Sequence, residues 1–285
     1  MGAMVGPASA PVPRVAAVTA LPAAPLLRFH EVPAYETREL LPRRTRYCIA
    51  PIVYNEGERF CRQIERMAER AALADIIVAE RRSSDGSTAP ELLRSHGVRA
   101  LLTTDEPGGA AAIRMALAYA LAQGYEGVIL MDGHGKDGVE ALPEYIRQLD
   151  AGADFVQGSR FMKGGVHKNT PLARTLGIRF VMSPLLFLSG RFWYTDSTNG
   201  FRGYSRRYLT HPRVEPLRAC FKNFNLQFFL SYMAPKLKLK VVEIPVSRVY
   251  PDDKTVPTKV IGFRRNFMVF WEMVLTVLGK YDPPS

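Results

Sequence analysis

Residues 127–137 read GVILMDGHGKD, and this stretch decides the fold class. Its apolar run ends abruptly in a loop that contains two aspartates, a histidine, a lysine and two glycines. A short apolar run bounded by turn residues is typical of a buried strand. A polar loop directly after such a strand is where an open α/β sheet binds its ligands.

The same pattern recurs along the chain. Apolar runs rich in β-branched residues alternate with segments in which apolar residues recur every three or four positions. This alternation predicts an α/β, Rossmann-like fold with a mainly parallel sheet and helices on both faces. The predicted strands span residues 47–53, 75–79, 98–103, 127–131 and 154–157.

The rest of the chain shows helical spacing of its apolar residues and, after Gly158, a different order of elements. One amphipathic helix is expected within residues 60–71, and a second over 109–123, which Gly124 ends. After Gly158 the order becomes helix, polar turn, short strand and helix, with a strand expected at 237–244 before a long amphipathic C-terminal helix. We interpret this second half as an acceptor-binding elaboration on the same sheet.

The N-terminal residues are rich in alanine and proline and show little periodicity. We predict a flexible extension over residues 1–45 and one domain over residues 46–285, with halves at 46–158 and 159–285. Only three cysteines occur, without a CxxC pair, which argues against a disulfide framework and a structural zinc site. This cysteine usage fits a reducing cytoplasm.

The charge balance predicts an anionic partner. The 38 Lys and Arg against 27 Asp and Glu leave a formal net charge of +11, which suits nucleic acid, an acidic membrane surface or a phosphorylated ligand. No nucleic-acid reader motif is present, and acidic residues concentrate at the strand ends. We therefore expect no nucleic-acid partner.

Two apolar stretches, residues 180–190 and 267–279, bear on membrane contact. Both are shorter than the roughly 18–20 residues that a spanning helix needs. Arg264 and Arg265 precede the second stretch, so both stretches could lie flat in a membrane interface. Amphipathic helices packed on the core explain them equally well. The expected location is cytoplasmic, with peripheral attachment at the inner face of the membrane as one option.

Four loops follow the predicted strands and carry glycines, carboxylates or cations. Such side chains suit a charged, hydroxyl-rich ligand. The loops read PIVYNEGE (51–58), AERRSSDGST (79–88), MDGHGKD (131–137) and GSRFMKGG (158–165).

Asp132 and His134 form the first candidate pair. Side chains two positions apart on an extended backbone share a face, so this pair can hold a divalent cation. Such a cation would neutralise the charge that develops on a departing diphosphate. The alternative is a solvated turn with an aspartate at a helix cap.

The neighbouring loops carry less specific signals. Arg160 is a candidate phosphate ligand because a guanidinium binds phosphate oxygens in a bidentate way, although a lone loop arginine is more often a surface charge. Glu80 and Asp85 can accept hydrogen bonds from a nucleobase or a ribose. They can equally belong to a turn followed by a helix cap.

Two later stretches add candidates. In DSTNGFRGYSR (196–206), Asp196 is a candidate general base and Arg202 a candidate phosphate clamp. A polar loop before a short strand is the alternative. The stretch YPDDKTVPTK (250–259), which ends at Lys259, reads as a loop that orders over a bound diphosphate.

Taken in order, these strings resemble the family 2 glycosyltransferases, and within them the polyprenyl-phosphate sugar synthases of the dolichyl-phosphate mannose synthase type. The resemblance covers about residues 47–280, in the family's order and at its spacing. The strings that carry it are YNEGE, DIIVAERRSSDGS, GGAAAIRMALAYA, GVILMDGHGKD, ADFVQGSRFMKGG, DSTNGFRGYSR and EIPVSRVYPDDKTVPTK.

The resemblance implies a GT-A fold and an inverting sugar transfer from a nucleoside-diphosphate sugar to a polyprenyl phosphate or a small hydroxyl-bearing acceptor. It implies that the first half binds the nucleotide sugar and the second half the acceptor; a homo-oligomer is left open. The implied catalytic residues are Asp196 and Arg202, and the implied metal ligands are Asp132 and His134. The implied nucleotide-sugar-binding residues are Pro51, Tyr54, Asn55, Glu56, Glu80, Asp85, Arg114, Asp132, Gly133, Arg160 and Lys259.

Several positions depart from the family pattern. Glu80 and Arg81 stand where paired aspartates are usual, which leaves the nucleobase open. His134 stands where a second aspartate is expected, and imidazole suits manganese better than magnesium, so we expect Mn2+ rather than Mg2+. Because Arg81 and Lys136 place positive charge where the family has carboxylate or amide, the alternative is a catalytically silent nucleotide-sugar-binding protein.

Overall fold

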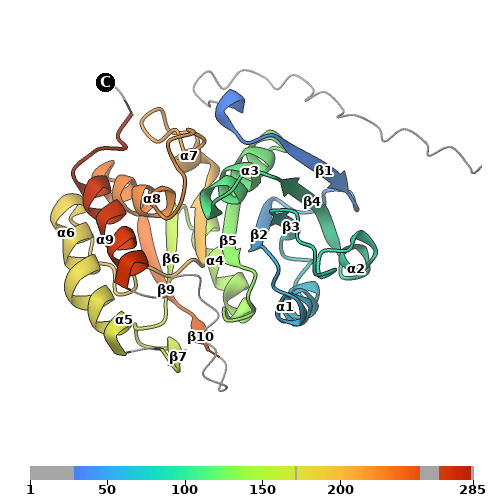
Figure 1. Cartoon of the computed structure of the whole chain (residues 1–285), viewed down its shortest axis with the longest axis horizontal. Coiled ribbons are helices and arrows are strands. Elements are labelled where there is room, and N and C mark those ends of the chain that lie inside the picture. Colours follow the sequence, from blue (N-terminus) through green and yellow to red (C-terminus); the bar gives the residue numbers. More distant parts are fainter. Residues whose placement is uncertain (1–28, 171, 251–262, 284–285) are drawn as a thin grey trace, which may run out of the picture.

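The computed structural model describes residues 29–170, 172–250 and 263–283. An eight-stranded sheet in the order β1-β4-β3-β2-β5-β8-β6-β9 runs through this part of the chain (Figure 1). The strands of this sheet are β1 (Tyr35–Glu39), β2 (Tyr47–Val53), β3 (Asp75–Glu80), β4 (Val98–Thr104), β5 (Gly127–Asp132), β6 (Phe155–Ser159), β8 (Arg202–Ser205) and β9 (Val241–Pro245).

The sheet is mainly parallel, as predicted. Strands β2 to β5 pair in parallel, and β6 pairs in parallel with β9. Strand β8 lies antiparallel between β5 and β6, and β1 lies antiparallel to β4 at the edge. All five predicted strands are present, and their ends differ from the predicted ones by at most two residues. The carboxyl ends of β2, β3 and β5 therefore meet at one edge, which positions the loops that follow them.

Helices cover both faces of the sheet because successive strand residues point to opposite sides. On β2, Ile49 packs into one apolar cluster with helices α1 and α4, whereas Cys48 packs into another with α3 and α8. The helices of these two layers are α1 (Glu58–Ala68), α2 (Pro90–Ser95), α3 (Gly109–Ala122), α4 (Leu142–Asp150), α7 (Arg206–Leu209) and α8 (Asn225–Lys236).

Further elements lie beside β6 and β9 (Figure 1). A small parallel sheet joins β7 (Val166–Lys168) to β10 (Ser247–Val249). Helices α5 (Leu172–Gly177), α6 (Ser183–Gly190) and α9 (Phe263–Val277) follow, with a π-helical turn at Ile178–Met182 between the first two. Within the described ranges, none of the helices combines the length and the apolar character needed to cross a bilayer.

Two expectations need correction. The predicted extension over residues 1–45 is wrong for Tyr35–Glu39, because β1 forms a full ladder with β4; residues 1–28 lie outside the described residues. The strand expected at 237–244 begins only at Val241. The amides of Leu237 and Leu239 donate to carbonyls in the last turn of α8, so these residues complete the helix end instead.

Candidate active site

The predicted Asp132–His134 pair lies at the carboxyl end of β5. Asp132 is the last residue of the strand, and its Oδ2 lies 3.8 Å from Nδ1 of His134. Arg248 on β10 donates a hydrogen bond of 2.8 Å to the same Oδ2 and a second bond to Asp137. Asn199 accepts a further bond from Arg248 at 3.3 Å. A guanidinium therefore bridges two carboxylates at this point.

Arg248 is not among the site residues predicted from the sequence. It belongs to the string SRVY, in which a strand-like alternation resembles that of any surface strand. In the structure Arg248 is only 7% exposed, and Asp137 is fully buried. An arginine is almost never fully buried unless it is paired, and the short string SRV gives no local sign that its arginine is buried between two carboxylates.

Burial and mutual attraction set the protonation of this cluster. Burial by itself raises the pKa of Asp132, but His134, Arg248 and Lys136 outweigh it and hold that pKa below its usual value. Burial raises the pKa of Asp137, although Arg248 opposes the shift. Burial, and then Arg248, lower the pKa of Lys136 to about 8. At neutral pH Asp132 is therefore ionised.

Two glycines, Gly133 and Gly200, allow the chain to pack closely beside Asp132. A Cβ on Gly133 would meet the Ile52 carbonyl oxygen at 2.8 Å, and a Cβ on Gly200 would meet Oδ1 of Asp132 at 3.0 Å. Gln63 of α1 donates to the Asp132 carbonyl at 2.8 Å and accepts from the Gly135 amide at 2.6 Å. These contacts fix the loop 133–136 against α1.

The predicted nucleotide-binding loops after β2 and β3 are joined to each other. Asn55 accepts from the Ser84 amide at 2.8 Å, and Asp85 accepts from the Gly57 amide at 2.7 Å. Burial by itself raises the pKa of Asp85, but hydrogen bonds from Ser87 and Gly57 outweigh it and lower that pKa. Asp85 thus links the two loops.

The other predicted residues in and beside these loops differ in solvent exposure. Tyr54 is exposed, and the Arg81 guanidinium lies 4.0 Å from the centre of its ring. Glu56 is partly exposed, whereas Pro51 is buried within β2. Glu80 is only 5% exposed and accepts hydrogen bonds from the Ser83 amide and the Thr88 and Thr103 hydroxyls.

The structure brings together Arg160, the candidate phosphate ligand, and Asp196, the candidate general base. Arg160 Nε lies 2.6 Å from Asp196 Oδ2, its Nη2 lies 3.1 Å from Oδ1, and both side chains are buried. In this arrangement Asp196 is held as a buried carboxylate and Arg160 as its counter-ion. A free general base and a free phosphate ligand are therefore not what the geometry presents.

Arg202 does not have the position expected of a phosphate clamp. Its guanidinium is fully buried and donates to the carbonyls of Asn199, Gln227 and Ser197. Arg114 on α3 is likewise buried, where it donates to the Glu31 carbonyl and to Glu106. Both arginines tie backbone segments together, and the roles predicted for them in ligand binding and catalysis stay predictions.

The remaining predicted residue, Lys259, lies outside the described residues, as does most of the loop predicted over residues 250–259.

Comparisons with known proteins identify a family and several relatives. Residues 48–211 match glycosyl transferase family 2. The chain is 29% identical to polyprenol monophosphomannose synthase of Mycolicibacterium smegmatis, over 68% of this chain and 74% of that protein. It is 26% identical to undecaprenyl-phosphate mannosyltransferase of Micrococcus luteus, over 69% of this chain and 80% of that protein.

Solved structures show the same fold. Glucosyl-3-phosphoglycerate synthase of Mycobacterium tuberculosis in complex with phosphoglyceric acid superposes with a TM-score of 0.58 at 15% identity, covering 84% of this chain and 81% of that one. The same enzyme in complex with Mn2+, UDP and glucosyl-3-phosphoglycerate gives a TM-score of 0.55 at 15% identity, with the same coverage. The shared architecture is the GT-A fold, as predicted.

Proposed function

The chain belongs to glycosyl transferase family 2, and from this premise we propose that it transfers a sugar from a nucleoside-diphosphate sugar to a polyprenyl phosphate, with inversion at the anomeric carbon. One observation carries the proposal. The ionised Asp132 ends a central strand beside His134 and the cationic Arg248, at the sheet edge where this fold binds ligands.

The donor half of the proposal rests on residues 46–158. The loops after β2 and β3 are held together by Asn55 and Asp85, which leaves the ring of Tyr54 exposed at their rim. An ordered rim of this kind can receive a nucleotide, while cations near Asp132 attract its diphosphate. A solved structure of the same fold holds UDP and Mn2+, which supports a nucleoside-diphosphate donor.

A divalent cation fits the residues beside β5. Oδ1 of Asp132 accepts no hydrogen bond from the described residues, and the imidazole of His134 lies next to the same carboxylate. The described ranges contain no group of three or more candidate ligands, so this would be a site that the donor helps to complete. We propose that Asp132 and His134 hold the ion, and that this oxygen and nitrogen set favours Mn2+ over Mg2+. When bound, such an ion stabilises the negative charge of a departing diphosphate.

The acceptor half of the proposal rests on residues 159–285 and on the pairing of Asp196. A hydroxyl acceptor needs a base to remove its proton, whereas a phosphate monoester is already ionised at neutral pH. Because Arg160 engages both oxygens of Asp196, that carboxylate is not placed to act as a free base. This geometry favours a phosphate acceptor, and the two curated relatives carry polyprenol and undecaprenyl-phosphate in their names.

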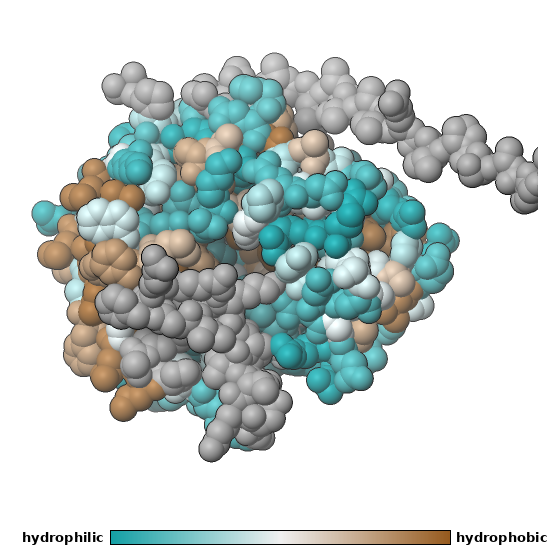
Figure 2. Space-filling view, in the orientation of Figure 1, coloured by the Kyte–Doolittle hydropathy of each residue, from teal (hydrophilic) through white to brown (hydrophobic). Residues whose placement is uncertain are grey.

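A lipid acceptor calls for contact with a membrane, and an apolar surface suits it. Phe180 and Leu188 are 71% and 77% exposed, and Figure 2 shows hydrophobic residues gathered over α6 and α9. Exposed Arg179 and Arg191 flank these residues in the chain. We propose that this apolar face contacts an anionic membrane surface. Its exposed members are Leu172, Leu176, Phe180, Val181, Phe187, Leu188, Trp193, Phe267, Met268, Trp271 and Leu278.

The proposed function is tested by sugar transfer. Purified protein would be given UDP, GDP, CDP and TDP sugars, Mn2+ and a polyprenyl phosphate, and product formation would be followed by chromatography. We expect transfer from one donor class, and loss of nearly all transfer in Asp132→Asn. The control is Glu144→Gln, which removes a surface ion pair with Arg147. Binding of a sugar nucleotide without transfer by the wild-type chain would support a silent binding protein instead.

A further inference from the structure

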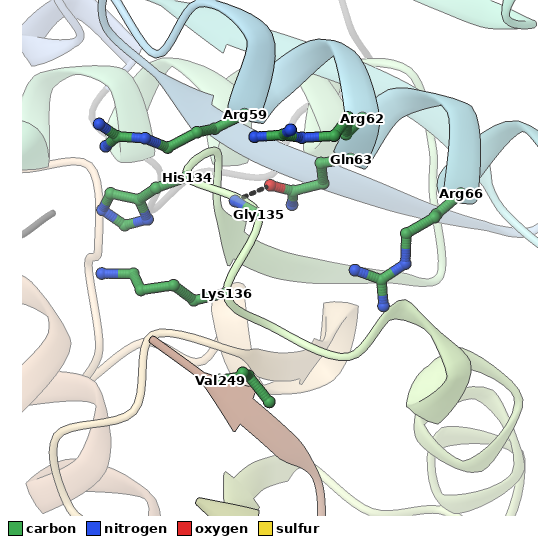
Figure 3. Close-up of a pocket in the computed structure, with 8 residues that line it drawn as sticks. All are labelled: Arg59, Arg62, Gln63, Arg66, His134, Gly135, Lys136 and Val249. Carbon is green, nitrogen blue, oxygen red and sulfur yellow. Dashed lines mark hydrogen bonds between the residues drawn. The ribbon is translucent and has the colours of Figure 1, made fainter. Parts of the chain in front are cut away.

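A pocket of about 230 Å3 lies between helix α1 and the loop that follows β5. Arg59, Arg62 and Arg66 enter it from α1, and His134 and Lys136 enter it from the loop (Figure 3). We call this the basic pocket. Of the residues predicted to bind the donor or a metal, His134 is the one that lines it.

The basic pocket gathers cationic side chains from α1 and from the loop after β5. Among the described residues that line it, none is acidic. Arg66 has a partner, because Nη2 lies 2.9 Å from Glu140. Arg59 and Arg62 form no ion pair with any described residue. Arg59, Arg62 and Arg66 are three or four positions apart on α1, so their side chains share one face of the helix and repel one another unless an anion lies between them.

The size of the basic pocket restricts the anion. Sites for drug-sized molecules typically have volumes of about 300–1,000 Å3, and this pocket is smaller. A phosphate or diphosphate group fits this space better than a whole sugar nucleotide. Guanidinium groups suit such a ligand because they bind phosphate oxygens through paired, charge-assisted hydrogen bonds.

Gln63 connects the basic pocket to the candidate active site. It lies on α1 between the arginines, and it holds both the Asp132 carbonyl and the Gly135 amide. Figure 3 shows its bond to Gly135 at the centre of the pocket. An anion bound by α1 and Lys136 would therefore brace the loop that carries His134.

We propose that the basic pocket is a second anion site, which binds a phosphate or diphosphate group separate from the diphosphate of the sugar donor. The shared chemistry is a phosphate group, whether it belongs to a soluble metabolite or to a lipid headgroup. The inference stands on the pocket itself and not on the identity of the sugar donor.

The test is calorimetric titration of the full chain with pyrophosphate in the presence of a chelator. Wild type, Arg62→Gln and Arg94→Gln would be compared, since Arg94 is an exposed arginine on α2 whose loss changes the net charge equally. We expect Arg62→Gln to weaken binding about tenfold or more, because a hydrogen bond to a charged group contributes that much. Arg94→Gln should bind like wild type.

A second arm separates the two sources of phosphate. Vesicles containing phosphatidic acid would be sedimented with the same three proteins. Weaker retention of Arg62→Gln alone would assign the phosphate to a lipid headgroup, and equal retention alongside weakened pyrophosphate binding would assign it to a soluble ligand. Equal binding of both ligands by Arg62→Gln and wild type would overturn the inference. The thermal shift caused by the sugar donor is measured on the same proteins, and it should be unchanged in Arg62→Gln. This measurement distinguishes a failure of the anion-site inference from a failure of the proposed sugar transfer.

Discussion

The Asp132 carboxylate and the Arg248 guanidinium lie 2.8 Å apart although 116 positions separate them in the chain. Arg248 also pairs with the buried Asp137, so one side chain from β10 holds the carboxylate at the end of β5 and a second carboxylate in the loop that follows. This contact joins residues 46–158 to residues 159–250 at the candidate active site.

Removal of Arg248 should therefore destabilise the protein strongly. In Arg248→Met two carboxylates lose their counter-ion, and breaking a buried pair in this way costs about 3–5 kcal/mol. Urea unfolding measures the change in the free energy of unfolding. The control is Arg147→Met, which removes an exposed pair with Glu144 and should cost at most about 1 kcal/mol. Equal losses in both variants would mean that the Arg248 cluster is not a buried ion-pair network.

The buried pair of Arg160 and Asp196 makes a second prediction. Asp196→Asn leaves the Arg160 charge unpaired and should lower the free energy of unfolding by about 3–5 kcal/mol. The double variant Arg160→Met, Asp196→Asn should recover much of this loss, because it removes the unpaired charge. Unfolding of the single and double variants gives the coupling.

Transfer to a polyprenyl phosphate, measured on the folded fraction of Asp196→Asn, supplies the second readout of this pair. A positioning role predicts a modest loss. A stable Asp196→Asn with a hundredfold to ten-thousandfold slower turnover would instead identify Asp196 as a general base, since a positioned base contributes about that much.

The strands and their loops could be predicted because their signals are local. The apolar runs of β2 to β5 and the helical spacing of α1 and α3 appear within short windows of the sequence. The edge strand β1 could not be predicted in this way, because its residues Tyr35–Glu39 are mostly exposed and polar and gain their order from β4. Placement of β8 between β5 and β6 likewise depends on contacts far apart in the chain.

Side-chain roles were harder to predict than strands. The local sequence GFR does not indicate whether Arg202 faces a ligand or donates to three buried carbonyls. The packing around Arg202 determines its partners. Arg160 and Asp196 were each predicted as functional groups, but their mutual distance is a property of the fold. By contrast, Asp132 and His134 are two positions apart, so their proximity followed from the local spacing.

Acid should loosen the two loops that Asp85 joins. Its folded-state pKa is lowered by hydrogen bonds from Ser87 and Gly57. A carboxylate with a lowered pKa contributes stability above its unfolded pKa of about 3.9 and loses that contribution as pH falls through the folded value. Asp85 is exposed, so solvent weakens this contribution. The free energy of unfolding of wild type should therefore exceed that of Asp85→Asn by only a few tenths of a kcal/mol at pH 7, and the difference should vanish in strong acid. Urea unfolding of both proteins as a function of pH checks this. A difference that does not change with pH would show that the charge of Asp85 is irrelevant to the link.

The apolar face over α5, α6 and α9 should determine attachment to lipid. Phe180 and Leu188 are 71% and 77% exposed, and full burial of each such side chain contributes roughly 1.5–3 kcal/mol. Replacing both by serine should thus weaken sedimentation with phosphatidylglycerol vesicles by about a hundredfold. The control is Leu73→Ser, because Leu73 is also exposed but follows α1, away from this face. Transfer to a short, water-soluble prenyl phosphate should be unaffected by either change, since the strand ends around Asp132 are untouched. If the double variant binds vesicles as tightly as wild type, the membrane contacts another part of the chain.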